Sequence, residues 1–173
     1  MGVKAVLSAV GSVPARLVLL GVFLGFVLID LAFDVESARG RYDTSKDFYF
    51  GRQQHDPRSR FVLLALPLGL LLLVSVAAVL GRPSWANGAG MLCVLAANAC
   101  GSFVIGQRVS MDEWQLAGAH AVGGEAEAEA EIERCLVRIC YAHFAMLPIL
   151  VAGAVFTSRD GPVPAAAAKS KSQ

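Results

Sequence analysis

Four apolar blocks divide the chain, and each is close to the length that a helix needs to cross a lipid bilayer. A helix rises about 1.5 Å per residue, so about 20 residues cover the roughly 30 Å of hydrocarbon in a membrane. The blocks cover residues 17–33, 61–81, 88–106 and 139–156. The sequence therefore predicts an all-α integral membrane protein, a four-helix bundle with four transmembrane helices and with both termini on the same side.

The composition agrees with a membrane protein and excludes one class of partner. Of the 173 residues, 55% are hydrophobic and only 17% are charged, which is more apolar than a typical soluble domain. The formal net charge of +1 gives the chain no general attraction for nucleic acid. We therefore expect membrane lipid, and not nucleic acid, around this protein.

The predicted organisation is one transmembrane domain between two short flanking segments. Residues 1–16 form an N-terminal juxtamembrane segment, residues 17–156 form the four-helix domain, and residues 157–173 form a C-terminal tail that we expect to be disordered. After the third block, Ser110 and Glu113 have the spacing of a capping box, which predicts a separate short helix. The Ala/Glu-rich stretch from Glu125 predicts a soluble beginning for the fourth helix and makes it the longest helix.

Small residues four positions apart occur in the first and third blocks. They are Gly21 and Gly25 in the first block, and Ala97 and Gly101 in the third. Helices in lipid associate by close packing over such residues. Both faces are therefore candidate contacts with other membrane proteins or with a second copy of the chain. The short connection over residues 82–87 predicts that the second and third helices are antiparallel neighbours.

The distribution of Lys and Arg indicates an orientation. The two long connections and the start of the fourth helix hold nine of the 15 basic residues, and the termini and the short connection hold six. Because cytoplasmic segments carry an excess of Lys and Arg, the long connections are expected to face the cytosol. The protein is thus predicted to be a multi-pass membrane protein with its termini on the opposite side.

Two pairs of opposite charges form the main candidate site. Asp30 and Asp34 lie near the end of the first helix, and Arg134 and Arg138 lie at the start of the fourth. Residues four apart share a helix face, and both pairs belong to the same side of the membrane. A charge in hydrocarbon costs about 2.5 kcal/mol or more, which pairing reduces. The sequence predicts neighbouring first and fourth helices, joined by Asp30 with Arg138 and by Asp34 with Arg134.

Four further residues are secondary candidates for this ionic cluster. Tyr141 follows Arg138 at helical spacing, and Gln107 and Arg108 end the third helix at the same depth. His143 is the one histidine within an apolar block, but it lies about 140° around the helix from Arg138. We expect a hydrogen-bonded structural role for His143, with a proton relay as the alternative.

Motifs for metal, cofactor or nucleophilic chemistry are absent from the sequence. It contains no H-x-x-x-H, H-E-x-x-H, C-x-x-C, Walker or dinucleotide-binding motif. The four cysteines have neither disulfide-framework nor zinc-site spacing. The sequence therefore predicts no metal site and no cofactor.

Three functions are compatible with these features. The leading hypothesis is a non-catalytic membrane component or accessory subunit. The alternatives are a membrane enzyme that acts on a lipid-like substrate through an Asp/His/Tyr cluster, and a small transporter or channel subunit. An Asp30 and His143 that converge on one cavity would favour the enzyme. A polar path to both faces would favour transport, and a fully paired core without a cavity would favour the component.

Overall fold

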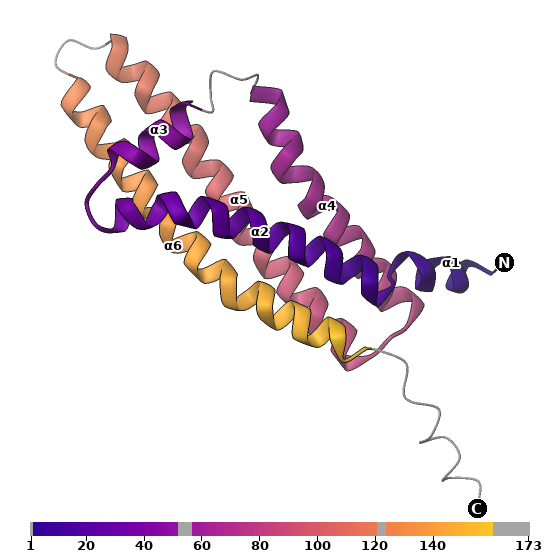
Figure 1. Cartoon of the computed structure of the whole chain (residues 1–173). Coiled ribbons are helices and arrows are strands. Elements are labelled where there is room, and N and C mark those ends of the chain that lie inside the picture. The colour runs from indigo at the N-terminus through magenta and orange to yellow at the C-terminus, as the bar shows by residue number, and fades with distance from the viewer. Residues whose placement is uncertain (1, 52–56, 121–123, 161–173) are drawn as a thin grey trace, which may run out of the picture.

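The computed structural model describes residues 2–51, 57–120 and 124–160, which form helices without any strand (Figure 1). The helices are α1 (Val3–Val10), α2 (Val13–Ala38), α3 (Asp43–Gly51), α4 (Pro57–Gly81), α5 (Trp85–His120) and α6 (Glu125–Ser158). The all-α class is therefore confirmed. Residues 157 and 158, predicted as the first of the C-terminal tail, belong to α6, and residues 161–173 lie outside the described residues.

Three helical stretches in the described part are long and apolar enough to cross a membrane. They are Val3–Ala38, Trp85–Gly118 and Glu125–Ser158, and a shorter apolar stretch covers Leu66–Gly81 in α4. The chain thus has the helices of a membrane protein.

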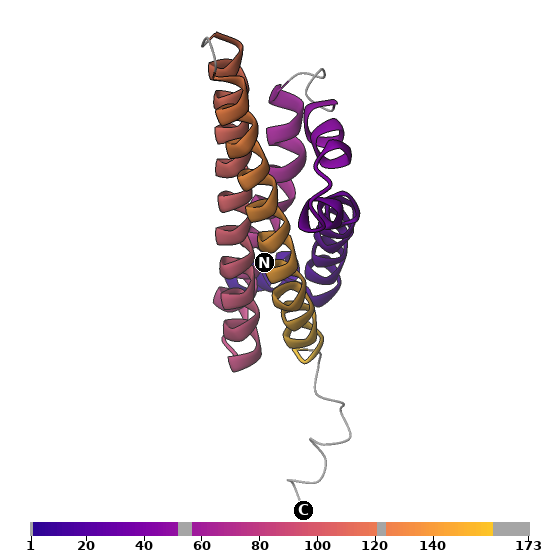
Figure 2. The same cartoon turned by 90° about the vertical axis from the view of Figure 1, so that its left-hand side faces the viewer.

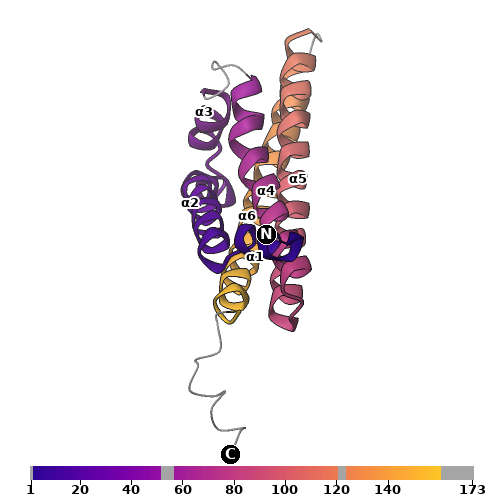
Figure 3. The same ribbon diagram turned by 90° about the vertical axis from the view of Figure 1, so that its right-hand side faces the viewer.

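The long helices pack as the two neighbour predictions require. α5 and α6 lie antiparallel and side by side, α2 packs against α6, and α4 contacts both α5 and α2 (Figures 1 and 2). α2 and α3 lie on one side of the bundle and α5 on the other, with α4 between them (Figure 3). Phe23 and Val27 of α2 and Leu136, Ile139 and Met146 of α6 belong to the buried core. The predicted contact of the first helix with the fourth, and of the second with the third, is confirmed.

The predicted helix break before Ser110 is wrong, because α5 continues without interruption to His120. The sequence between Gly106 and Glu113 has no proline, so nothing there removes a backbone hydrogen bond. Tertiary packing also supports the extension, since Met111 is buried and a Cβ on Gly118 would lie 2.8 Å from the Cβ of Ala128 in α6. α5 has 36 residues and α6 has 34, so the longest helix is α5.

Glycines allow α1 to pack closely against the end of α4. A Cβ added to Gly11 would lie 2.3 Å from the backbone nitrogen of Ala78, and one added to Gly81 would lie 2.8 Å from the backbone nitrogen of Ser8. Real Cβ atoms do not approach backbone atoms this closely, so both positions require glycine.

The two small-residue faces differ in their surroundings. A Cβ on Gly101 would lie 2.9 Å from the Cδ1 of Leu68, and Ala97 is fully buried, so this face is covered by α4 within the chain. By contrast, nothing lies within 4 Å of a Cβ built on Gly21 or Gly25. Of these two small-residue faces, only the one on α2 is therefore open for another helix.

Candidate functional site

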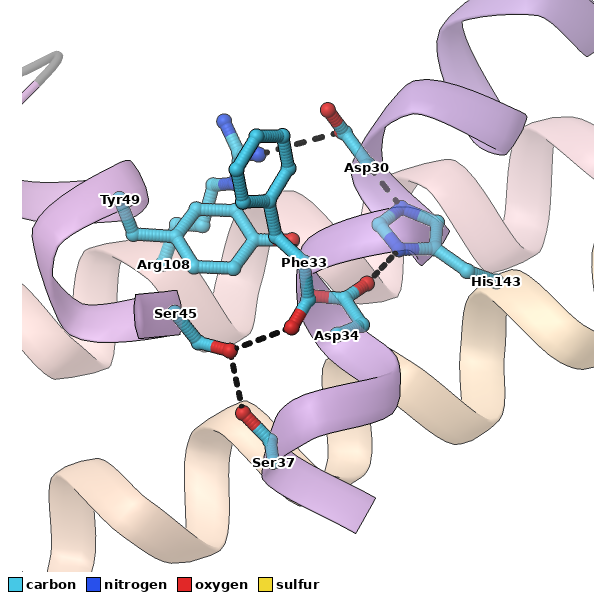
Figure 4. Close-up of polar contacts among 8 residues, drawn as sticks. All are labelled: Asp30, Phe33, Asp34, Ser37, Ser45, Tyr49, Arg108 and His143. Carbon is cyan, nitrogen blue, oxygen red and sulfur yellow. Dashed lines mark hydrogen bonds and ion pairs between the residues drawn. The ribbon is translucent and has the colours of Figure 1, made fainter. Parts of the chain in front are cut away.

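Asp34 is the centre of a buried polar network that joins three helices (Figure 4). Its side chain on α2 is fully buried, and its Oδ1 accepts a hydrogen bond of 2.6 Å from the Tyr49 hydroxyl on α3. Its Oδ2 lies 2.5 Å from Nδ1 of His143 on α6. This short contact joins the carboxyl group of α2 to the imidazole ring of α6.

Asp30 extends the network by one helical turn along α2. Its Oδ2 lies 3.9 Å from Nε2 of His143 and 3.4 Å from Nη2 of Arg108, so the imidazole sits between two carboxylates. Arg108 comes from α5, and its Cζ lies 4.4 Å from the centre of the Tyr49 ring, a cation–π geometry. The site therefore connects α2, α3, α5 and α6 through charged and polar side chains.

Short-range contacts hold α3, and with it Tyr49, in place. Gly40 has φ of 75°, a left-handed conformation that lets the chain turn sharply after α2. The Ser37 hydroxyl then donates to the Ser45 hydroxyl at 2.7 Å, and that hydroxyl donates to the Phe33 carbonyl at 2.7 Å (Figure 4). Because these bonds tie α3 back to α2, the Tyr49 hydroxyl is directed at Asp34.

An ion pair links the other face of α3 to α6. Nζ of Lys46 lies 2.8 Å from Glu129 and 3.3 Å from Glu133. This contact and the serine bonds restrain α3 from two sides. The restraint reduces the entropy cost of holding Tyr49 in a single position.

A small cavity adjoins the site between α2, α4, α5 and α6. Its volume is about 20 Å³, and its polar lining comes from Asp30 and His143. The remaining lining is mainly apolar and includes Phe23, Leu68 and Met146. A space of this size holds about one water molecule, and no larger ligand.

The structure does not form the ion pairs that the sequence predicts. Arg138 is exposed and lies 3.5 Å from Gln107, whereas Arg134 pairs with Glu131 on its own helix. Both predicted partnerships, Asp30 with Arg138 and Asp34 with Arg134, are therefore wrong. α6 is turned so that the face bearing Ile139, His143 and Met146 meets α2, and both arginines lie off that face.

Two of the secondary candidates join the site and two do not. Arg108 lies beside Asp30, and His143 lies between the two acids, although the helical offset from Arg138 places it outside the predicted cluster. Tyr141 is 65% exposed, and Gln107 contacts Arg138 at the surface.

Sequence reasoning misses Tyr49 and a second polar cluster at the opposite end of the bundle. Arg16, only 2% exposed, donates to Asn87 at 2.6 Å and forms an ion pair with Asp160 at 2.9 Å. This arginine directly precedes the first apolar block, a position that suggests an exposed side chain. Its burial depends on Asn87 and Asp160, which are distant in sequence.

The Tyr49 phenol is expected to remain protonated in alkaline solution. Burial raises its pKa above the ordinary value, and the charge of Asp34 raises it further. We predict that the wild type and Tyr49→Phe give the same tyrosinate absorbance up to about pH 11, one unit above the ordinary pKa of tyrosine. A tyrosinate signal in the wild type that Tyr49→Phe lacks would show that the phenol is open to solvent.

The structure and the comparisons give no indication of a bound metal or of a known family. Among the described residues, no group of three His, Cys, Asp or Glu side chains is placed to hold a metal ion. Comparisons with protein families, curated proteins and solved structures give no match for the chain.

Proposed function

We propose that the protein is a four-pass membrane protein in which α2, α4, α5 and α6 all cross the bilayer. α4 has 25 residues and contains the apolar block 61–81, which supports a fourth crossing besides the three long helices. The ion pair of Arg16 with Asp160 joins the start of α2 to the end of α6. This contact supports an even number of crossings, with both termini on the side opposite the long connections.

Within this topology, the protein acts as a non-catalytic membrane component. The observation that carries this proposal is that both carboxyl oxygens of Asp34 are hydrogen-bonded to side chains of other helices. The adjoining cavity of about 20 Å³ admits no lipid-like substrate. The acids are therefore assigned to holding α2, α3, α5 and α6 in one arrangement, which presents the outer faces of the bundle to partners.

The open glycine face of α2 is the proposed contact with another membrane protein. Gly21 and Gly25 have free space above them, and the exposed side chains of Val18, Val22 and Leu28 lie on the same helix. A transmembrane helix of a partner can approach the α2 backbone closely at the glycines.

Purification in a mild detergent, with measurement of the molecular mass of the complex, tests this function. We expect a larger assembly for the wild type, its loss in Gly21→Leu, and its retention in Gly106→Leu. Both glycines are exposed, and a Cβ at either position would meet nothing within 4 Å, so Gly106 is a matched control. A wild-type protein that is monomeric both in the detergent and after crosslinking in its membrane contradicts the proposal.

A membrane enzyme is the second candidate, because Asp30 and His143 do line one cavity. With Nδ1 held by Asp34, Nε2 of His143 is the ring atom directed toward Asp30, as in an oriented acid–base pair. Substrate entry would require α4 to move away from α2. A lipid-like molecule that co-purifies with the wild type and is lost in His143→Gln would favour the enzyme over the component.

Transport has less support than either of these functions. The Arg16 cluster and the Asp34 network lie at opposite ends of α2, and the buried side chains of Leu20, Phe23 and Val27 separate them. The described residues therefore offer no continuous polar path between the two ends of the bundle.

A further inference from the structure

Two grooves meet at Arg138 and Tyr141 on the outer surface of α6. One has a volume of about 510 Å³ and an otherwise apolar lining from α5 and α6 that includes Ala99, Cys100 and Phe103. The other, of about 410 Å³, lies toward the long connections and includes Tyr42 and Arg134 in its lining. Both are wide, open depressions on the surface of the helices.

Among the charged side chains that line these grooves, Arg138 is the one without a carboxylate partner in the described residues. Arg134 contacts Glu131, and Lys46 contacts both Glu129 and Glu133. Arg138 instead donates to the neutral side chain of Gln107 at the long distance of 3.5 Å. Among the described residues it has no carboxylate within ion-pair distance, so its guanidinium can bind an anion.

The depth of Arg138 indicates where this anion would lie. In the four-pass topology, Arg138 immediately precedes the apolar segment 139–156, so its guanidinium is level with the lipid headgroups. Tyr141 and Tyr42, which are amphipathic side chains, flank it at the same level. The apolar groove along Ala99 and Phe103 extends from Arg138 into the part of the bundle that contacts acyl chains.

We propose that this surface binds one anionic glycerophospholipid. The phosphate is held by Arg138, and an acyl chain lies along the apolar groove between α5 and α6. A basic side chain at the headgroup level next to an interhelical groove is the combination that selects anionic lipids. The depth argument rests on the four-pass topology, whereas the binding itself can be measured in detergent without assuming that topology or any partner.

Native mass spectrometry of the detergent-solubilised protein tests the site with added phosphatidylglycerol or phosphatidylcholine. We expect the wild type to retain phosphatidylglycerol in preference to phosphatidylcholine, and Arg138→Gln to retain about fivefold less of it. Arg159→Gln is the matched control, because it removes an exposed arginine from the other end of α6. Equal retention of phosphatidylglycerol by the wild type and Arg138→Gln would overturn the proposal.

A second variant and a competitor distinguish binding of the whole lipid from binding of its free headgroup. Ala99 is exposed and lines the apolar groove, so Ala99→Phe should fill the groove without disturbing the core and should lower lipid retention. Glycerol phosphate should not displace the bound lipid, because it lacks the acyl chain. Displacement by glycerol phosphate, or full retention in Ala99→Phe, would contradict the part of the proposal that concerns the acyl chain.

Discussion

Replacing Asp34 with alanine is expected to lower the free energy of unfolding by about 3–5 kcal/mol, the cost of removing one partner from a buried charged network. The variant leaves the Tyr49 hydroxyl and Nδ1 of His143 buried without their hydrogen-bond partner. It also creates a cavity at a side chain that is fully buried. We therefore expect Asp34→Ala to lose more stability than the alanine variant of any acidic residue outside the network.

Unfolding in mixed detergent micelles measures this effect, and Asp47→Ala is its control. Asp47 lies on α3 two residues before Tyr49, and it is exposed. Its replacement should change the stability by no more than about 0.5 kcal/mol, as is usual for surface positions. If Asp34→Ala were as stable as Asp47→Ala, the network would not hold the helices together.

Replacing Arg16 with alanine is expected to have an effect of similar size at the other end of the bundle, again about 3–5 kcal/mol. The side chain of Asp160 is only 10% exposed and would lose its ion-pair partner, and Asn87 would lose the bond of 2.6 Å. Because Arg16 joins the start of α2 to the start of α5 and to the end of α6, the loss should loosen all three contacts.

A second substitution distinguishes the broken ion pair from general damage to the fold. Replacing a buried pair with apolar residues is often neutral, so Arg16→Met combined with Asp160→Leu should recover much of the stability. Arg159→Ala, which removes an exposed charge beside Asp160, should have little effect. A loss in the double variant that equals the sum of the two single losses would show that the pair contributes nothing.

The sequence predicts the helices and their neighbours because both depend on long apolar blocks and on connection length. It also identifies Asp30 and Asp34 as buried acids that need partners. It fails on the partners, because the face that α6 presents to α2 is decided by packing. His143 lies on the same helix face as the buried residues Ile139 and Met146. This apolar face indicates that His143 is buried, whereas its spacing from Arg138 does not.

The sequence does not predict that Tyr49 belongs to the site, for a different physical reason. It belongs to a connection without a long periodic pattern, and its position depends on the turn at Gly40 and on the bond between Ser37 and Ser45. Arg16 and Asp160 are 144 positions apart, so only the folded arrangement of α2 and α6 brings them together. Contacts of this range follow from tertiary packing and have no local signature.

Labelling of single cysteines with a membrane-impermeant maleimide tests the four-pass topology most directly. The native cysteines are first replaced, and cysteine is then placed at Arg39, Pro83, Glu127 or Ser158, which are all exposed at ends of the long helices. We predict that the cysteines at Arg39 and Glu127 react from one side of the membrane, and those at Pro83 and Ser158 only from the other. A cysteine at Pro83 that reacts from the same side as one at Arg39 would contradict this topology, because α4, which lies between them, would then fail to cross.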